Sequence, residues 1–179
     1  MEMLKMRQKA MPNLWFRLME LEYRTRSRAQ NAARELTAVG IEAGMRVVDF
    51  GCGPGRYTIP AAALVGPSGE VFAVDVHPLA MKAVEKAAAK ERLVNVRTVR
   101  SDCATGLEPE SVDAVLLFDA LHDVEDKESA LAELRRVLKP KGRLLYKDHT
   151  LNGPRLLALM RENDLRPWGR SDVLSFVKC

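Results

Sequence analysis

Short apolar runs alternate with longer amphipathic stretches from residue 41 to the end of the chain. The short runs predict strands near residues 45–50, 70–75, 95–100, 112–118, 142–148, 164–169 and 172–178. The stretches between them carry apolar residues at helical spacing, which predicts helices near 57–65, 78–91, 126–138 and 153–162. Strands that alternate with helices indicate a parallel sheet covered by helices on both faces.

The chain before residue 41 has helical periodicity instead. We expect one helix over 13–26, with apolar residues on more than one stripe, and a second near 27–39. Residues 1–40 would then form a helical lid or cap, and residues 41–179 the main part of a single domain. The alternatives are a helix that only covers the domain, or one that pairs with a second copy of the chain in a homodimer.

Three glycines at alternate positions follow the first predicted strand. Asp49 ends this strand, and Gly51, Gly53 and Gly55 complete the pattern D-x-G-x-G-x-G. Glycine permits positive φ and lacks the Cβ that would keep a ligand off the backbone, so we expect a sharp turn whose amide N–H groups face an open space. Such a turn forms a nucleotide-type pocket at the carboxyl end of a parallel sheet.

A second acid, Asp75, ends the strand near 70–75. A carboxylate at this place accepts hydrogen bonds from a ribose diol. The dinucleotide pattern G-x-G-x-x-G differs in spacing and places a pyrophosphate on the helix N-terminus. Asp49 before the glycines would repel a pyrophosphate but suits an ammonium group. The ligand implied by these residues therefore carries a ribose and an amine.

Five blocks extend this pattern along the chain: V-V-D-F-G-C-G-P-G-R at 47–56, V-F-A-V-D-V-H-P at 71–78, S-D-C-A-T-G-L at 101–107, D-A-V-L-L-F-D-A-L-H-D-V at 113–124 and L-K-P-K-G-R-L-L-Y at 138–146. Together they resemble the class I S-adenosylmethionine-dependent methyltransferases, most closely the small ubiquinone/menaquinone-biosynthesis-like branch. The resemblance covers about residues 36–179. It implies a doubly wound, mostly parallel seven-stranded α/β sheet of Rossmann-like type with an antiparallel last strand, and S-adenosyl-L-methionine as the cofactor.

The resemblance also implies roles for residues at the strand ends. Asp49 would contact the methionine amine of the cofactor directly or through water, Asp75 its ribose hydroxyls, and Asp102 its adenine amino group. The full set of expected cofactor contacts is Asp49, Gly51, Cys52, Gly53, Gly55, Asp75, Val76, His77, Asp102, Cys103, Asp119 and Ala120. Local alternatives are a cap on the glycine turn for Asp49, a helix start for His77 and a turn for Asp102.

Methyl transfer from a sulfonium chiefly requires that donor and nucleophile be held in near-attack geometry. A general base is needed only when the nucleophile arrives protonated. The candidate catalytic residues are Asp119 and His122, which follow the strand near 112–118; His122 is chosen because an imidazole titrates near neutrality. The alternative for His122 is a loop cap. Lys147, Asp148 and His149 lie at the same predicted sheet edge, and none of them is singled out for a direct role.

Composition limits the other functions. The net charge of +4 is modest, so nucleic acid is not an expected partner. The three cysteines are widely spaced, which predicts no metal site and indicates a reducing compartment. No apolar run approaches the ~20 residues of a membrane span, and no signal-peptide pattern opens the chain, so we expect a cytoplasmic location.

The substrate can be narrowed only in part. The segment 119–122 reads D-A-L-H instead of N/D-P-P-Y/F, which disfavours planar amide and adenine-amine targets, and Trp15, Phe16 and Tyr23 indicate a small hydrophobic or amphipathic acceptor. The leading hypothesis is a methyltransferase acting on such an acceptor. The alternatives are a nicotinamide-dependent oxidoreductase and a non-catalytic cofactor-binding module of the same fold.

Overall fold

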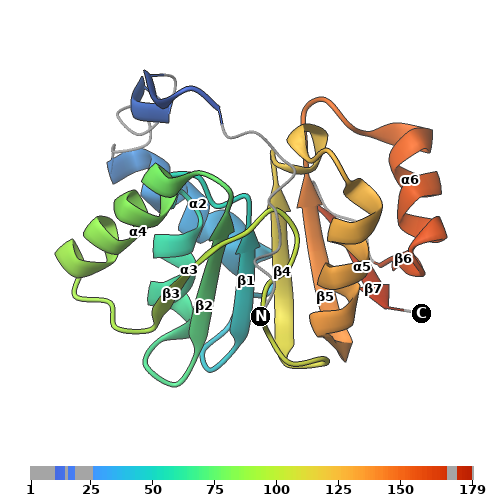
Figure 1. Cartoon of the computed structure of the whole chain (residues 1–179). Helices are drawn as coiled ribbons and strands as arrows, with labels where there is room; N and C mark the ends of the chain where they lie inside the picture. The colour runs from blue at the N-terminus through green and yellow to red at the C-terminus, as the bar shows by residue number, and fades with distance from the viewer. Residues whose placement is uncertain (1–10, 15, 19–25, 169–172, 179) are drawn as a thin grey trace.

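The computed structural model describes residues 11–14, 16–18, 26–168 and 173–178. Its centre is a seven-stranded sheet in the order β3-β2-β1-β4-β5-β7-β6. The strands are β1 Arg46–Phe50, β2 Glu70–Asp75, β3 Val96–Arg100, β4 Val112–Phe118, β5 Leu138–Lys147, β6 Leu165–Pro167 and β7 Leu174–Lys178. Strands β1 to β5 are parallel, and β7 runs antiparallel to β5 and β6 (Figure 1). This arrangement confirms the doubly wound α/β class.

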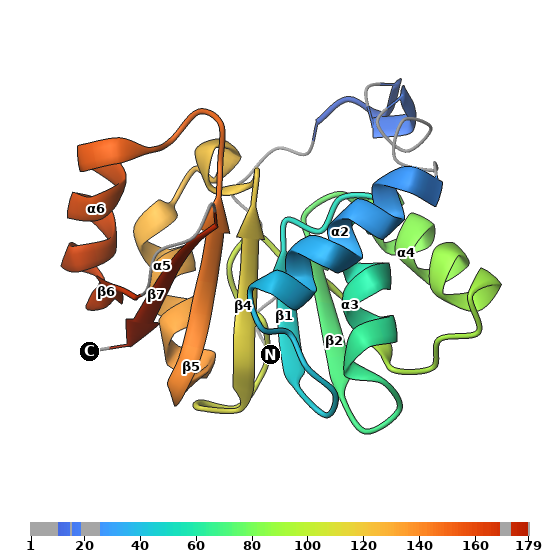
Figure 2. The ribbon, with the colours of Figure 1, turned by 180° about the vertical axis from the view of Figure 1, so that it is seen from behind.

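Helices cover both faces of the sheet. They are α2 Arg26–Ala38, α3 Thr58–Val65, α4 Pro78–Lys90, α5 Lys127–Val137 and α6 Gly153–Glu162, with the 3-10 helix η1 at Leu121–Asp123. Seen from behind, α2 and α3 lie over β1 and β2, whereas α5 and α6 cover the opposite face (Figure 2). Neighbouring residues of β1 pack on opposite sides, Val47 with the α2–α3 layer and Val48 with the α5–α6 layer. Burial on both faces explains why these strands are continuous apolar runs.

One predicted boundary is wrong. We expected the helix near 126–138 to be followed by a strand only from residue 142, but β5 begins at Leu138, directly after α5. Leu138 pairs with Val112 and is fully buried, whereas Ala114 pairs with Arg143, so the residues between them bulge out of the ladder. Burial of Leu138 holds this residue in the sheet, and the K-P-K-G segment that follows, which has turn composition, forms the bulge.

The N-terminal segment is only partly described. Residues 13–14 and 16–18 are helical, in agreement with the start of the predicted 13–26 helix, and α2 agrees with the second predicted helix. The rest of the first helix, 19–25, lies outside the described residues, as do 169–172 near the predicted C-terminal strands.

The glycine turn after β1 packs against the loop after β4. Gly51 has φ +74°, and a Cβ built on it would lie 2.3 Å from the Cβ of Ala120. Carbon atoms cannot approach this closely, so glycine is needed both for its backbone conformation and for the contact between the two loops.

Replacing Gly51 with alanine should therefore destabilise the protein more than the same change at Gly106. Gly106 has a similar φ of +71° but open space around its Cα. The positive φ costs about 1–2 kcal/mol at either site, and the clash with Ala120 adds about 1–3 kcal/mol at Gly51 alone. Urea unfolding measures the free energy of unfolding of both variants. Equal losses in the two variants would show that the loops separate without cost.

Candidate active site

A cavity of about 310 Å³ opens at the carboxyl ends of β1, β2 and β4. Eight of the expected cofactor contacts line it: Gly51, Gly53, Asp75, Val76, His77, Asp102, Asp119 and Ala120. Its other lining residues are Met11, Phe16, Phe50, Val74, Ser101, Asp123 and Val124. The structure thus brings together residues from the first four strand ends. The expected contacts Asp49, Cys52, Gly55 and Cys103 are not on the cavity wall.

The amide groups of the glycine turn do not face an open space, which corrects our expectation. The N–H groups of Gly51 and Cys52 both donate to the carbonyl of Val74, at 2.8 and 3.1 Å. Gly53 N–H donates to Asp75 Oδ2 at 2.9 Å, and Gly55 N–H donates to Cys52 O at 3.0 Å. The hydrogen bonding between β1 and β2 continues past the strand ends and uses these donors. A pyrophosphate cradle needs such donors free, so the geometry does not favour a nicotinamide dinucleotide.

Asp75 lies on the cavity wall. Its two carboxylate oxygens accept from the backbone N–H groups of Gly53 and His77, at 2.9 and 2.8 Å. Burial raises the pKa of Asp75, and these two hydrogen bonds oppose the rise. A carboxylate has about four acceptor positions, so Asp75 retains capacity for a ligand diol.

Asp49 lies beneath the turn rather than in the cavity. Its side chain is buried and its Oδ2 accepts from Thr58 Oγ1 at 2.6 Å. Burial raises the pKa of Asp49 from 3.8 to about 7, the Thr58 hydroxyl lowers it, and the charge of Asp75 raises it again. This position agrees with the alternative for Asp49, in which its side chain caps the glycine turn. A contact of Asp49 with the methionine amine stays a prediction.

Both described cysteines have a raised thiol pKa. Cys52 is buried, and burial raises the pKa of its thiol well above 9.0. Burial also raises the pKa of the Cys103 thiol, with the charge of Asp102 adding to it. Since the thiolate is the reactive form, these environments do not activate either thiol as a nucleophile.

The N-terminal segment packs onto the cavity through His77. Phe16 is buried and stacks on the His77 ring, with 4.4 Å between ring centroids and 18° between planes. His77 Nδ1 accepts from Leu79 N–H, which caps α4, so Nε2 carries the proton and donates to Met11 O at 3.0 Å. This confirms the alternative in which His77 starts a helix. Only the fold shows that it also holds the N-terminal segment.

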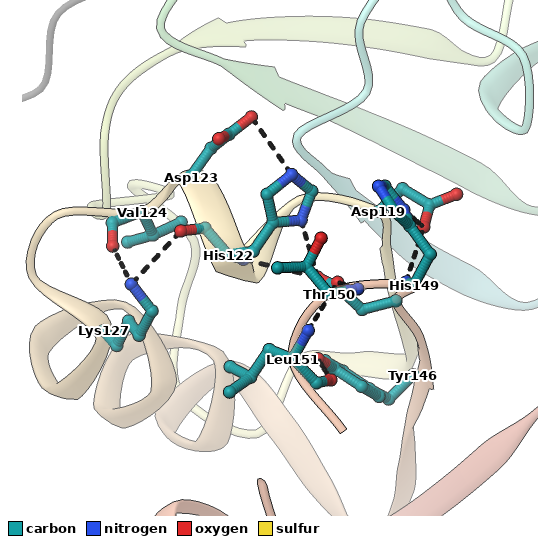
Figure 3. A network of polar contacts seen from close by, with 10 residues as sticks. Asp119, His122, Asp123, Val124, Lys127, Tyr146, His149, Thr150 and Leu151 are labelled. Carbon is teal, nitrogen blue, oxygen red and sulfur yellow. Dashed lines mark hydrogen bonds and ion pairs between the residues drawn. The ribbon is translucent and has the colours of Figure 1, made fainter. Parts of the chain in front are cut away.

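Two histidine–aspartate pairs lie side by side after β4 and β5 (Figure 3). His122 Nδ1 is 2.9 Å from Asp148 Oδ2, and His149 Nδ1 is 2.9 Å from Asp119 Oδ1. The two rings meet edge to face at 5.2 Å. Hydrogen bonding to Asp119 raises the pKa of His149. Sequence reasoning identified His122 but missed Asp148 as its partner. The signal was available, because the ends of adjacent parallel strands meet at one sheet edge.

One group at this edge has metal-ligand geometry. Among the described residues, single ligand atoms of Asp119, Asp148 and His149 all lie within 4.8 Å of one another. The sequence predicted no metal, and that prediction stays untested.

A family model described as "Methyltransferase domain" matches residues 41–168. The chain belongs to this methyltransferase family. It is 36% identical over 126 residues to the ubiquinone/menaquinone biosynthesis C-methyltransferase UbiE of Ectopseudomonas mendocina, a match that covers 66% of this chain and 47% of that protein. It is 30% identical over 108 residues to the demethylmenaquinone methyltransferase of Geobacillus sp., covering 60% and 46%. The chain thus spans about half the length of these curated relatives.

Solved structures share the fold. A SAM-dependent methyltransferase from Aquifex aeolicus superposes with a TM-score of 0.75 at 22% identity, covering 94% of this chain and 97% of that one. An arsenic (III) S-adenosylmethionine methyltransferase from Chlamydomonas reinhardtii gives 0.63 at 24% identity, covering 78% and 65%. Family membership makes this a class I methyltransferase domain whose cofactor is S-adenosylmethionine.

The cavity fits this cofactor. Asp75 offers acceptor positions for a ribose, and Gly53 beside it has no Cβ to obstruct the ligand. Asp102 and Asp119 add carboxylates to the wall, which suits a ligand that carries positive charge. In the part of the chain that the structure describes, no helix has the length and apolar character required to cross a bilayer.

The pKa of Asp49 generates a prediction about stability. The native protein binds a proton at Asp49 up to about pH 7, whereas an unfolded chain releases it near 3.8, so the free energy of unfolding should fall as pH rises through this window. The full loss is on the order of 4 kcal/mol. The substitution Asp49→Asn removes the titrating group, and with it this loss of stability, but keeps an acceptor for the Thr58 hydroxyl.

The melting temperature of Asp49→Asn should therefore exceed that of the wild type at pH 8.5, and the difference should shrink steadily as the pH falls from 7 toward 3.8. Asp164→Asn, on the surface beside Arg135, serves as the matched control and should follow the wild type. If Asp49→Asn loses stability with pH as steeply as the wild type does, Asp49 is ionised in the native protein.

Proposed function

We propose that this protein transfers the methyl group of S-adenosylmethionine to a small hydrophobic or amphipathic acceptor. The observation that carries the proposal is that one cavity is lined both by Gly53 and Asp75, from the ends of β1 and β2, and by Asp119 and Asp123, which follow β4. The residues expected to hold the cofactor and the polar residues that follow β4 therefore line the same cavity. The curated relatives named as ubiquinone/menaquinone biosynthesis and demethylmenaquinone methyltransferases support an acceptor of quinol type.

Different residues of this cavity would bind different parts of the cofactor. When bound, S-adenosylmethionine supplies a methyl group already activated by the sulfonium charge. Asp75 would hold the ribose hydroxyls and Asp102 the adenine amino group, while Val76 would pack on the adenine. Asp119, which follows β4, would face the methionine and sulfonium end of the cofactor. Orienting donor and acceptor in near-attack geometry can contribute about 7–11 kcal/mol, so these positioning residues supply most of the catalysis.

Charge favours this ligand over a dinucleotide. The cavity wall carries the carboxylates of Asp75, Asp102, Asp119 and Asp123. A cation is attracted to such a wall, and a pyrophosphate is repelled. The nicotinamide oxidoreductase is therefore not favoured, and turnover separates an enzyme from a non-catalytic binding module.

The N-terminal segment acts as the lid, with residues 1–40 forming the cap and 41–179 the catalytic part. Met11 and Phe16 line the cavity together with the strand ends. Phe16 is buried against His77, whereas Leu14 and Leu18 on the same segment are 69% and 52% exposed. One face of this segment therefore closes the site and excludes water from the reacting groups.

Calorimetry tests the cofactor assignment. S-adenosylmethionine and its demethylated product should bind with micromolar affinity, and nicotinamide dinucleotides should not bind. Asp75→Ala leaves ribose donors unpaired in a partly buried site, at a cost of about 1–3 kcal/mol, or about 5- to 150-fold in affinity. Thermal melting confirms that the variant is folded. Unchanged affinity would remove Asp75 from the ribose site, and tighter binding of a dinucleotide would overturn the function.

The lid makes a separate prediction. Phe16→Ala removes the stack on His77 and should weaken cofactor binding on the order of tenfold, about 1.4 kcal/mol. Leu18→Ala, two residues away but exposed, is the control and should bind as the wild type does. Both are measured with S-adenosylhomocysteine. Similar affinities for the two variants would mean that the segment does not close over the cofactor.

A further inference from the structure

His122 is held in one orientation by a single carboxylate. Asp148 Oδ2 accepts from the His122 backbone N–H at 3.3 Å and from the ring Nδ1 at 2.9 Å. The other oxygen, Oδ1, accepts from the N–H groups of Thr150 and Leu151, at 2.8 and 3.0 Å (Figure 3). Because a carboxylate only accepts, the neutral His122 ring carries its proton on Nδ1. Nε2 is then left as a proton acceptor.

Asp148 remains ionised in this position. Its side chain is fully buried. Burial acts to raise its pKa, but the hydrogen bonds from Leu151, the His122 ring and Thr150 outweigh burial and hold the pKa below its usual value. A buried anion with four donors is rigid, so it fixes the direction of the imidazole ring.

His122 is not one of the residues that line the cavity, but its Nε2 lies directly beside a residue that does. His122 Nε2 is 3.5 Å from Asp123 Oδ2, and Asp123 lines the cavity. The His122 side chain is 20% exposed, which leaves a path for a small molecule. The second pair differs, because His149 is 74% exposed and its partner Asp119 40% exposed, so nothing fixes its ring as firmly.

We infer that His122 is a general base oriented by Asp148, a positioning residue, and that the methyl acceptor is a neutral molecule with a weakly acidic hydroxyl, a phenol or an enol. This inference rests on the proposed methyl transfer. His122 Nε2 takes the hydroxyl proton, and the electron pair left on the acceptor forms the new bond to the methyl carbon, through oxygen or the conjugated carbon. The bond from methyl carbon to sulfur breaks at the same time, and sulfur keeps its pair. If carbon is methylated, the ring proton leaves to solvent.

The surroundings of His122 agree with a neutral acceptor. The groups that face it are Asp148, Asp123 and the ring of His149, and Lys127 Nζ bonds the His122 carbonyl at 3.4 Å. After taking a proton, Nε2–H can donate to Asp123. The carboxylates of the cavity wall would repel an anionic acceptor, whereas a hydroxyl becomes charged only when the base is in reach.

A divalent cation at Asp119, Asp148 and His149 is the competing explanation for this cluster. The hydrogen bonds argue against it, because both oxygens of Asp148 have two donors each and Asp119 Oδ1 accepts from His149. A cation would have to displace these contacts. The test below includes it as an outcome.

The first test needs no acceptor. The chain has only three histidines, so ¹⁵N-histidine labelling and long-range ¹H–¹⁵N spectra resolve each ring. At pH 8, His122 should be the Nδ1–H tautomer and His77 the Nε2–H tautomer, with His149→Gln assigning the third ring. An Nε2–H tautomer at His122 would overturn the dyad. So would selective broadening of His122 and His149 by substoichiometric Mn²⁺, which would show a cation site.

The second test measures chemistry, as S-adenosylhomocysteine formed with phenol and 1,4-naphthohydroquinone as probes. His122→Asn should lower kcat by about 10²–10⁴-fold while the affinity for S-adenosylmethionine stays within threefold. Asp148→Asn should lower kcat about tenfold or more and move the acid limb of the pH profile to lower pH, because the protonated ring loses its counter-charge. His149→Gln, which leaves the His149 backbone contact to Asp119 in place, is the control and should stay within threefold of the wild type.

The outcomes distinguish a failure of the His122–Asp148 dyad from a failure of the proposed methyl transfer. Full kcat in His122→Asn, or an unchanged pH profile in a folded Asp148→Asn, would overturn the dyad and leave the methyltransferase intact. Methylation of an amine or thiol but of neither hydroxyl probe would overturn the acceptor class. Absence of S-adenosylmethionine binding by the wild type would overturn the proposed function itself, whatever the tautomer of His122.

Discussion

The contact between Gly51 and Ala120 is the constraint on which the site depends. Strands β1 and β4 are parallel neighbours, so the turn after one and the loop after the other emerge at the same edge of the sheet. They can share that edge only because Gly51 has no Cβ toward Ala120. This close approach places the cofactor side of the cavity within reach of the polar cluster after β4 and β5. A wider separation would leave donor and acceptor apart, and methyl transfer depends chiefly on proximity.

The same compact turn determines which ligand the cavity accepts. The turn uses its own N–H groups to extend the hydrogen bonding between β1 and β2, with Val74 and Asp75 as acceptors. What remains at the surface is carboxylate rather than amide. Similar strand–turn–helix units that leave the amides free bind pyrophosphate. Here the chemistry is reversed, and buried Asp49 lies underneath at a cost in stability at high pH. One local hydrogen-bond pattern thus separates two ligand classes on one fold.

The local pattern of apolar residues was sufficient to predict most of the fold. The features that it did not predict depend on contacts between residues far apart in the sequence. The sheet class, the order of elements and most boundaries followed from apolar periodicity. The start of β5 did not, because burial of Leu138 against Val112 overrides the turn composition that follows. Eight of the residues expected to contact the cofactor line the cavity. However, the hydrogen bonds of the amides in the glycine turn and the stacking of Phe16 on His77 involve residues far apart in the sequence. No window of sequence contains both partners of such contacts.

The two halves of the cavity make different demands on the chain. The half formed by β1 and β2 only has to hold a ligand, and backbone hydrogen bonds to Asp75 suffice for that. On the side of the loop after β4, the proposed methyl transfer also requires a directed proton acceptor, which a backbone cannot provide. A side chain can do so only if its ring is fixed, and the fully buried Asp148 fixes His122, whereas the exposed His149 has no such support. Under the proposed mechanism, the acceptor chemistry of this protein depends on the place where β4 and β5 end, because a buried carboxylate that follows one strand orients a side chain that follows the other.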